Sequence, residues 1–157
     1  MSPAIAFSRP PRDDLVASLD AEPDQADINA IVAGLLSFNK RHTDDDAPAY
    51  LVASLRDPEG TLFGGLFGAT YVGWLYVHSF WLPEAMRGRG HGRRLLSLAE
   101  DEAVRRGCPR VFLETLSFQA LGFYEKCGYE VVSRLEGFPP GGARYALTKM
   151  LGEPTPA

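Results

Sequence analysis

The chain has 157 residues, of which 45% are hydrophobic and 23% charged, and its formal net charge is −4. This length suits one domain, and the composition is that of a folded globular protein rather than a disordered or collagen-like one. No apolar run approaches the ~18 residues of a membrane span, and the first residues lack the apolar core of a secretory signal. Two cysteines are too few for a disulfide scaffold or a structural zinc site. We therefore expect a cytoplasmic protein without a metal, and with no membrane or nucleic-acid partner.

The first recognisable element is a helix over Pro23–Arg41. Apolar residues such as Ile28 and Leu35 recur there at helical spacing, and Asp24 lies in the first turn. The apolar pattern at Leu15–Leu19 indicates one further strand before this helix.

The rest of the chain predicts strands interrupted by two helices. An amphipathic helix is expected over Gly92–Arg106, ending at Gly107, and a short helix over Phe118–Lys126. The strands are expected at Ala49–Leu55, Thr61–Thr70, Trp74–Leu82, Arg110–Thr115, Tyr129–Leu135 and Arg144–Lys149. This order predicts a mixed α/β sheet in one domain over residues 13–151, between flexible tails at 1–12 and 152–157.

The most informative segment joins the third of these strands to the long helix. Its alternating glycines, Gly88, Gly90 and Gly92, allow successive backbone amides to turn inward. The helix that follows adds the positive end of its dipole, so the segment predicts a binding site for a pyrophosphate. The spacing matches neither the nucleotide-binding pattern Gly-x-x-x-x-Gly-Lys-Ser/Thr nor the dinucleotide fingerprint Gly-x-Gly-x-x-Gly.

The pattern Arg87-x-x-Gly90-x-Gly92 resembles the acyl-CoA pyrophosphate loop of the GNAT N-acetyltransferase superfamily. A second segment, from Ser117 to Tyr129, is similar to that superfamily's Asn-x-x-Ala-x-x-Leu-Tyr-x-x-x-Gly-Phe motif, with Ser117 in place of the asparagine. The resemblance covers about residues 15–151. It is strongest to a branch of small bacterial acetyltransferases, through Phe38-Asn39, Thr115-Leu116-Ser117-Phe118-Gln119-Ala120 and Pro139-Pro140-Gly141.

The resemblance implies a mostly antiparallel sheet, flanked by helices, in which two central parallel strands splay apart around acetyl-CoA. These strands would be Trp74–Leu82 and Arg110–Thr115, and the cosubstrate would be acetyl-CoA with no metal. The residues expected to contact it are Phe80, Trp81, Leu82, Arg87, Gly88, Arg89, Gly90, His91, Gly92, Arg93, Ser117, Gln119, Phe123 and Tyr124.

Three residues are candidates for proton transfer. Tyr124 matches the tyrosine that faces the CoA sulfur in many family members, where it would protonate the leaving thiolate or donate a hydrogen bond to it. His78 titrates near neutrality and lies on a strand where several members carry a base, so it is the first candidate to deprotonate the amine. Glu114, near the end of the next strand, is the alternative, and water chains could also do this work. Cys127 is expected to be a packing residue.

The resemblance places the acceptor pocket among aromatic side chains and the loop before the last strand. Its expected residues are Phe38, Asn39, Trp74, Tyr76 and Phe138. Aromatic walls and an acidic N-terminal half are suited to a small cationic amine. We therefore expect direct transfer of an acetyl group from acetyl-CoA to a small primary amine in a ternary complex. The alternatives are a protein N-terminal or lysine acetyltransferase and a non-catalytic acyl-CoA-binding domain, and the exposed aromatic strands permit a homodimer.

Overall fold

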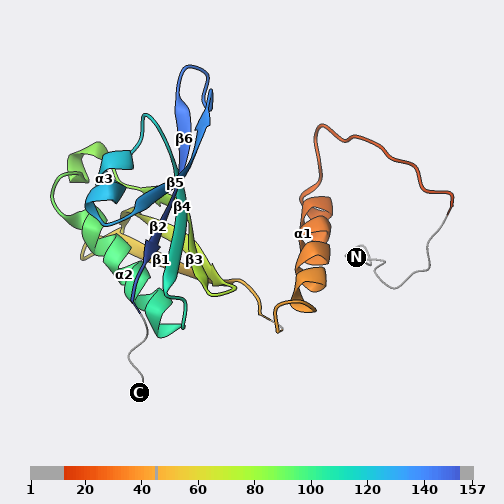
Figure 1. The fold of residues 1–157 in the computed structure, drawn as a ribbon, viewed down its shortest axis with the longest axis horizontal. Coiled ribbons are helices and arrows are strands. Elements are labelled where there is room, and N and C mark those ends of the chain that lie inside the picture. The colour runs from red at the N-terminus through yellow and green to blue at the C-terminus, as the bar shows by residue number, and fades with distance from the viewer. Residues whose placement is uncertain (1–12, 45, 153–157) are drawn as a thin grey trace. The chain divides into compact units, whose positions relative to one another are not determined.

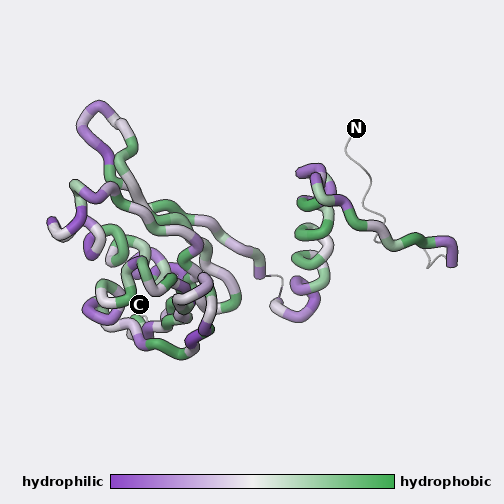
Figure 2. The backbone as a smooth tube through the Cα atoms, turned by 90° about the horizontal axis from the view of Figure 1, so that it is seen from above, coloured by the Kyte–Doolittle hydropathy of each residue, from purple (hydrophilic) through white to green (hydrophobic). Residues whose placement is uncertain are grey.

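The computed structural model describes residues 13–44 and 46–152, and the chain divides into two compact units between Ala47 and Pro48. The first unit contains the expected helix, α1, over Gln25–Lys40. The carboxylate of Asp24 caps it by accepting a hydrogen bond from the Ala26 amide at 3.0 Å. Asp27 lies in the first turn and Lys40 in the last, where each complements the helix dipole. Apolar turns are visible along α1 in Figure 2, and none of its side chains is buried within this unit.

The strand expected at Leu15–Leu19 is not formed. Residues 15–20 have no regular secondary structure, and Leu15, Val16 and Leu19 are exposed. Alternation of apolar residues favours a strand only where a neighbouring strand supplies hydrogen bonds. None of the six described strands pairs with this segment.

The second unit is built on a six-stranded sheet with the order β1-β2-β3-β4-β6-β5 (Figure 1). The strands are β1 (Ala49–Arg56), β2 (Leu62–Tyr71), β3 (Trp74–Trp81), β4 (Arg110–Leu116), β5 (Glu130–Glu136) and β6 (Ala143–Met150). Every neighbouring pair is antiparallel except β3 and β4, which are parallel. The prediction of a mixed, mostly antiparallel sheet with a central parallel pair is therefore confirmed.

Two helices and a short 3-10 turn connect the strands of this unit. They are η1 (Glu84–Met86), α2 (His91–Arg105) and α3 (Leu121–Lys126). Helix α2 packs against the face of β1, β2 and β3 (Figure 1), and its buried residues, among them Leu95 and Leu96, join the core. The largest fully buried side chains are Leu66, Leu75, Leu96, Val111, Leu113 and Leu147. None of the helices in the described part of the chain combines the length and apolarity that a membrane span requires.

The two parallel strands separate after only four residue pairs, from Trp74 opposite Arg110 to Val77 opposite Leu113. The separation begins at a bulge in β3, because Ser79 lies opposite Phe67 and Val77 opposite Gly68, so that His78 has no partner in β2. A bulge bends and twists its strand. Beyond it β3 stays paired with β2, while β4 continues beside β6 as far as Leu116. The splayed arrangement expected from the resemblance is therefore confirmed.

Candidate active site

The glycine loop follows β3 directly and is held in place by Arg87. The Arg87 Nε donates a hydrogen bond to the Leu82 carbonyl at 3.0 Å, which closes the loop on itself. Gly88 and Gly90 have φ angles of +70° and +83°, the left-handed region that L side chains rarely adopt. A Cβ on Gly92 would lie 3.3 Å from the Phe123 ring, so this third glycine allows α2 to approach α3 closely.

The amides of this loop have no hydrogen-bond partners in the described part of the chain. Among residues 13–44 and 46–152, the amides from Gly88 to Arg93 donate no backbone hydrogen bond, and Gly90 caps α2 without a side-chain hydrogen bond. Unpaired amides at the positive end of a helix favour an anion. The Arg93 guanidinium donates to the Lys126 carbonyl at 3.3 Å, so its side chain is directed to α3 and its amide is the group left for a ligand.

Phenylalanine rings line the gap between the loop and α3. The Phe80 and Phe123 ring centroids are 6.0 Å apart in an edge-on arrangement, and Leu82 is buried beside them. Trp81 points away from the core and is exposed. Beyond Val77, no strand of the described residues pairs with β3 on its β4 side, so the backbone of that edge is available to a bound ligand.

Tyr124 lies on α3 and is buried, with 6% of its surface exposed. Its ring packs edge-on against Phe123 at 5.2 Å and Tyr129 at 5.7 Å between centroids. Burial, and to a smaller extent the neighbouring Cys127, raises the pKa of Tyr124 to about 12. No hydrogen bond joins its hydroxyl to another residue in the described part of the chain. Because no fully buried polar side-chain atom there lacks a partner, this hydroxyl is not completely enclosed by the protein.

Cys127 lies one turn beyond Tyr124 and is half-buried. Burial raises the pKa of its thiol, and the nearby Arg93 and Lys149 oppose that effect only in part. A thiol must be ionised to act as a nucleophile, so this environment does not activate it. The expectation that Cys127 is a packing residue is consistent with its contact with the core.

His78, at the bulge, belongs to a row of rings on the sheet face opposite α2. Its centroid lies 4.2 Å from that of Tyr76 and 5.3 Å from that of Phe67, while Tyr76 lies 5.4 Å from Phe112. Partial burial lowers the pKa of His78 from its ordinary value. This shift favours the neutral imidazole, which is the state that accepts a proton.

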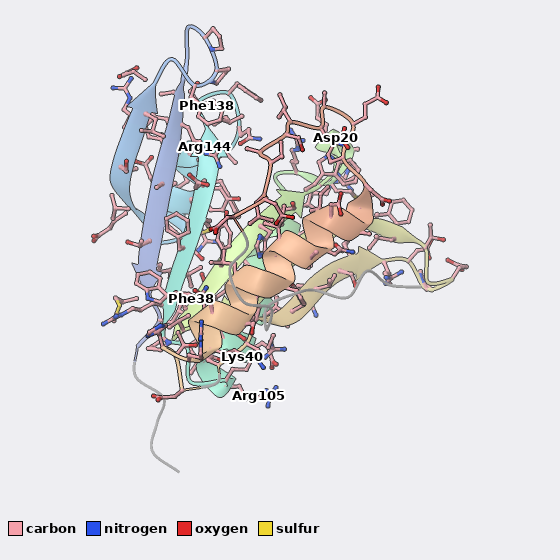
Figure 3. All side chains as sticks on the ribbon, turned by 90° about the vertical axis from the view of Figure 1, so that its right-hand side faces the viewer. Asp20, Phe38, Lys40, Arg105, Phe138 and Arg144 are labelled. Atoms are coloured by element: carbon pink, nitrogen blue, oxygen red, sulfur yellow. The ribbon has the colours of Figure 1, made fainter. Side chains whose placement is uncertain are left out.

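Glu114, the other candidate base, forms an ion pair with Arg144 across the β4–β6 ladder. The Arg144 guanidinium also lies over the Phe138 ring, 4.9 Å from its centroid. Both residues belong to the β5–β6 hairpin region, which extends beyond the rest of the sheet (Figure 3). Glu114 is thus a charge partner that fixes Arg144, and neither Arg144 nor this pairing was predicted from the sequence. No local sequence pattern signals it, because the partners are 30 residues apart.

Two residues expected to bind the cosubstrate have side-chain partners within the protein. The Ser117 Oγ accepts a hydrogen bond from the Ala143 amide at 3.2 Å. The Gln119 Oε1 accepts from the Leu116 amide at 2.7 Å and closes the turn after β4. That turn occupies residues 117–120, so α3 begins at Leu121 rather than at the expected Phe118. Contact of either side chain with acetyl-CoA stays a prediction.

The expected acceptor residues fall into both units of the chain. Trp74 and Tyr76 lie on the same face of β3 as His78. The Arg110 guanidinium lies over the Trp74 ring, 5.6 Å from its centroid. Phe138 is half-exposed on the hairpin. Phe38 and Asn39 lie in the first unit, so their part in the pocket stays a prediction. Phe112, which contacts Tyr76, was not predicted, although its alternation with Glu114 along β4 is a signal that could have identified it.

Comparison with known proteins shows which family has this sequence pattern and fold. The acetyltransferase (GNAT) family model matches residues 15–129. The chain belongs to the GNAT acetyltransferase family. This membership confirms the prediction of an acyl-CoA-dependent N-acyltransferase, and it supports acetyl-CoA as the cosubstrate.

Two curated acetyltransferases resemble this GNAT protein over most of its length. Acetyltransferase Atu2258 of Agrobacterium fabrum is 36% identical over 116 residues, which are 74% of this chain and 82% of the relative. Blasticidin-S acetyltransferase of Streptomyces morookaense is 40% identical over 93 residues, which are 59% of this chain and 68% of the relative.

Solved structures show the same fold. A crystal structure from Agrobacterium tumefaciens superposes with a TM-score of 0.81 and 32% identity, covering 87% of this chain and 99% of the other. An acetyltransferase from Bacillus cereus superposes with a TM-score of 0.68 and 27% identity, covering 85% and 98%.

Proposed function

We propose that this GNAT protein transfers the acetyl group of acetyl-CoA directly to a primary amine of a small molecule, in a ternary complex. The observation that carries the proposal is the open edge of β3 beyond Val77, next to the unpaired amides from Gly88 to Arg93. A thioester on a long phosphorylated arm needs both features at once. One end requires an anion site, and the arm requires an extended backbone with free hydrogen-bonding groups.

In this proposal the loop amides bind the pyrophosphate of acetyl-CoA. The backbone of β3 near Phe80 and Leu82 binds the pantetheine arm and donates a hydrogen bond to the thioester carbonyl. That bond stabilises the oxyanion that forms when the amine attacks. The residues present fit the cosubstrate because the loop is open at Gly88 and Gly90, where nothing lies within 4 Å of the Cβ position.

Tyr124 then acts on the leaving sulfur as a hydrogen-bond donor. Its pKa of about 12 keeps the phenol protonated at every physiological pH. The ordinary thiol pKa is ~8.5, so complete proton transfer from Tyr124 to the thiolate is uphill by roughly 3.5 pKa units, or about 5 kcal/mol. A hydrogen bond to the thiolate stabilises the negative charge without that transfer.

His78 accepts the proton of the attacking amine. Partial burial lowers its pKa and favours the neutral imidazole, which lies next to Tyr76 and Phe67 at the point where the strands open. Direct transfer is favoured over an acetylated cysteine because burial raises the pKa of the Cys127 thiol and so suppresses its thiolate.

A small acceptor is supported by the relative named blasticidin-S acetyltransferase, which is 40% identical over 93 residues. The β5–β6 hairpin adds a second reason. The Phe138 ring lies under the Arg144 guanidinium, and Arg144 pairs with Leu116 at the end of β4, so this bulky ring leaves less room for a long peptide. The aromatic row of Tyr76, His78 and Phe112, whose rings are tilted against one another, provides an aromatic wall for a compact amine.

The test is release of CoA from acetyl-CoA in the presence of four acceptors. These are blasticidin S, spermidine, a peptide with a free N-terminus and a peptide with a single lysine. Release with one of the first two acceptors is expected, at a lower rate in Tyr124→Phe. Release only with a peptide would refute the small-molecule acceptor. Calorimetric binding of acetyl-CoA without release for any acceptor would indicate a binding domain, and absence of binding would refute the cosubstrate site.

A further inference from the structure

A polar cluster on the far side of Tyr124 joins three elements of the fold. Glu100 on α2 accepts hydrogen bonds from the Tyr129 hydroxyl at 2.8 Å and from the Lys149 ammonium, on β6, at 2.9 and 2.8 Å. Tyr129 lies three residues after the end of α3, just before β5, and is 3% exposed. The side chains of Glu100 and Lys149 are 14% and 23% exposed, so the ion pair is largely screened from water.

The cluster holds Tyr129 from both sides. The Lys149 ammonium lies 5.4 Å from the centroid of the Tyr129 ring, on its face, while the carboxylate of Glu100 holds the hydroxyl. A buried hydrogen bond between a phenol and a carboxylate is stronger than a neutral one, and the lysine neutralises the carboxylate that makes it. These contacts therefore fix the side-chain rotamer of Tyr129 and the position of its hydroxyl.

Tyr129 in turn contacts Tyr124 at two points. Its amide donates a hydrogen bond to the Tyr124 carbonyl at 3.1 Å, and its ring packs edge-on against the Tyr124 ring. The hydroxyl of Tyr124 has no hydrogen bond of its own to the described residues that would orient it. The orientation of the Tyr124 side chain is thus set by packing, and Tyr129 and Phe123 are the aromatic rings that contact it.

We propose that Glu100, Lys149 and Tyr129 form a positioning cluster that aims the Tyr124 hydroxyl at the sulfur of bound CoA. The cluster also ties α2, whose N-terminus carries the anion loop, to α3, which carries Tyr124. The binding sites for the pyrophosphate and for the sulfur of the cosubstrate are thereby held at a fixed distance from each other. This inference rests on the proposed function, because it requires Tyr124 to lie at the CoA sulfur.

The test uses CoA itself as the probe, so it needs no acceptor. The pKa of the thiol in the protein–CoA complex is read from the ultraviolet absorbance of the thiolate as pH is varied, and the dissociation constant is measured by calorimetry. If Tyr124 donates to the thiolate, Tyr124→Phe raises the bound thiol pKa by roughly one to two units. Tyr129→Phe and Glu100→Gln raise it by part of that amount, with CoA affinity within about threefold of wild type.

The double variant Tyr124→Phe/Tyr129→Phe separates positioning from general loosening. A residue that acts through Tyr124 adds nothing once the Tyr124 hydroxyl is gone, so the double variant should match Tyr124→Phe alone. The control is Arg105→Gln, which breaks an exposed ion pair to Glu102 on the same helix and should leave the thiol pKa unchanged. Thermal unfolding checks each variant, and Glu100→Gln carries the test if Tyr129→Phe does not fold.

The outcomes distinguish the two proposals. An unchanged thiol pKa in Tyr124→Phe would overturn the placement of Tyr124 at the sulfur, and the positioning cluster with it. A raised pKa in Tyr124→Phe together with no change in Tyr129→Phe and Glu100→Gln would overturn the cluster alone. So would a further rise in the double variant, or a CoA affinity that falls in parallel with the shift, because either would show a structural effect that does not act through Tyr124.

Discussion

Replacement of Gly90 by alanine tests the anion loop by adding a single methyl group, which makes the backbone conformation of this residue less favourable. Gly90 has φ +83° and ψ −7°, and nothing lies within 4 Å of the position that a Cβ would occupy. The methyl group therefore meets no neighbour, and the whole cost is conformational. An alanine held in this left-handed region costs about 1–2 kcal/mol, which the loop can avoid only by turning its peptide groups.

Turning those groups should weaken cosubstrate binding. The amides of Gly90 and His91 are among those without a partner in the described structure, so they are free to donate to a phosphate. One hydrogen bond to a charged group contributes about 1.5–3 kcal/mol, so loss of one amide contact predicts a dissociation constant about 10- to 100-fold higher. Gly90→Glu should bind still more weakly because its carboxylate adds repulsion.

The matched control is Gly60→Ala, in the turn between β1 and β2. Gly60 has φ +89° and likewise nothing within 4 Å, so alanine brings the same strain at a position remote from the loop. Calorimetry with acetyl-CoA should show weakened binding only in Gly90→Ala, while both variants lose a similar amount of thermal stability. The reasoning would be refuted if Gly90→Ala bound acetyl-CoA as the wild type does, or if Gly60→Ala lost the same affinity.

Three further predictions concern the thiol, the base and the core. Cys127→Ala should keep kcat within about threefold of wild type, since a thiol whose pKa burial raises is a poor nucleophile, and a loss above 100-fold would indicate a covalent intermediate. In the wild type, the rate should fall at acid pH, below the ordinary histidine pKa of 6.5, because only the neutral imidazole of His78 accepts a proton, and His78→Gln should abolish this acid limb of the pH–rate profile. Glu114→Gln, which only releases Arg144, should retain the limb. Leu66→Ala, at a side chain 1% exposed, should lower the free energy of unfolding by about 2–5 kcal/mol in a denaturant titration, and a cost below 1 kcal/mol would contradict its place in the core.

The elements predicted best are those whose signal is local. Helix α2 was expected over Gly92–Arg106 and is formed over His91–Arg105, because its apolar face and its final glycine lie within one segment. The strand expected at Leu15–Leu19 was wrong, since a strand depends on a partner that the segment itself does not encode. The predicted start of α3 was wrong by three residues. The helical spacing of apolar residues extends back to Phe118, but a hydrogen bond from the Leu116 amide to the Gln119 side chain forms a turn there instead.

The candidate site divides in the same way. The glycine loop and Tyr124 were found from short motifs, each of which needs particular residues within a few positions. The bulge at His78 could not be predicted, because it exists only in the register between β2 and β3. The ion pair of Glu114 with Arg144 and the cluster around Glu100 join residues 30 and 49 positions apart. No pattern in a single sequence predicts such pairs. They determine which carboxylates already form ion pairs within the protein.

The proton balance of the proposed reaction follows from the order of three pKa values. The amine, with an ordinary pKa of ~10.4, attacks in its neutral form, because its ammonium is a weaker acid than the imidazolium of His78, whose pKa is lowered. Once the nitrogen has bonded to the thioester carbon it is positively charged and strongly acidic, so His78 accepts its proton at that stage, while the thiol of CoA has an ordinary pKa of ~8.5. The imidazolium is therefore a stronger acid than the thiol, so its proton passes to the thiolate in a downhill step, directly or through water. Tyr124, with a pKa of about 12, never ionises in this sequence and supplies only a hydrogen bond. Tyr124→Phe should then lower kcat without removing a basic limb from the pH profile, whereas loss of such a limb would show that Tyr124 itself gives up its proton.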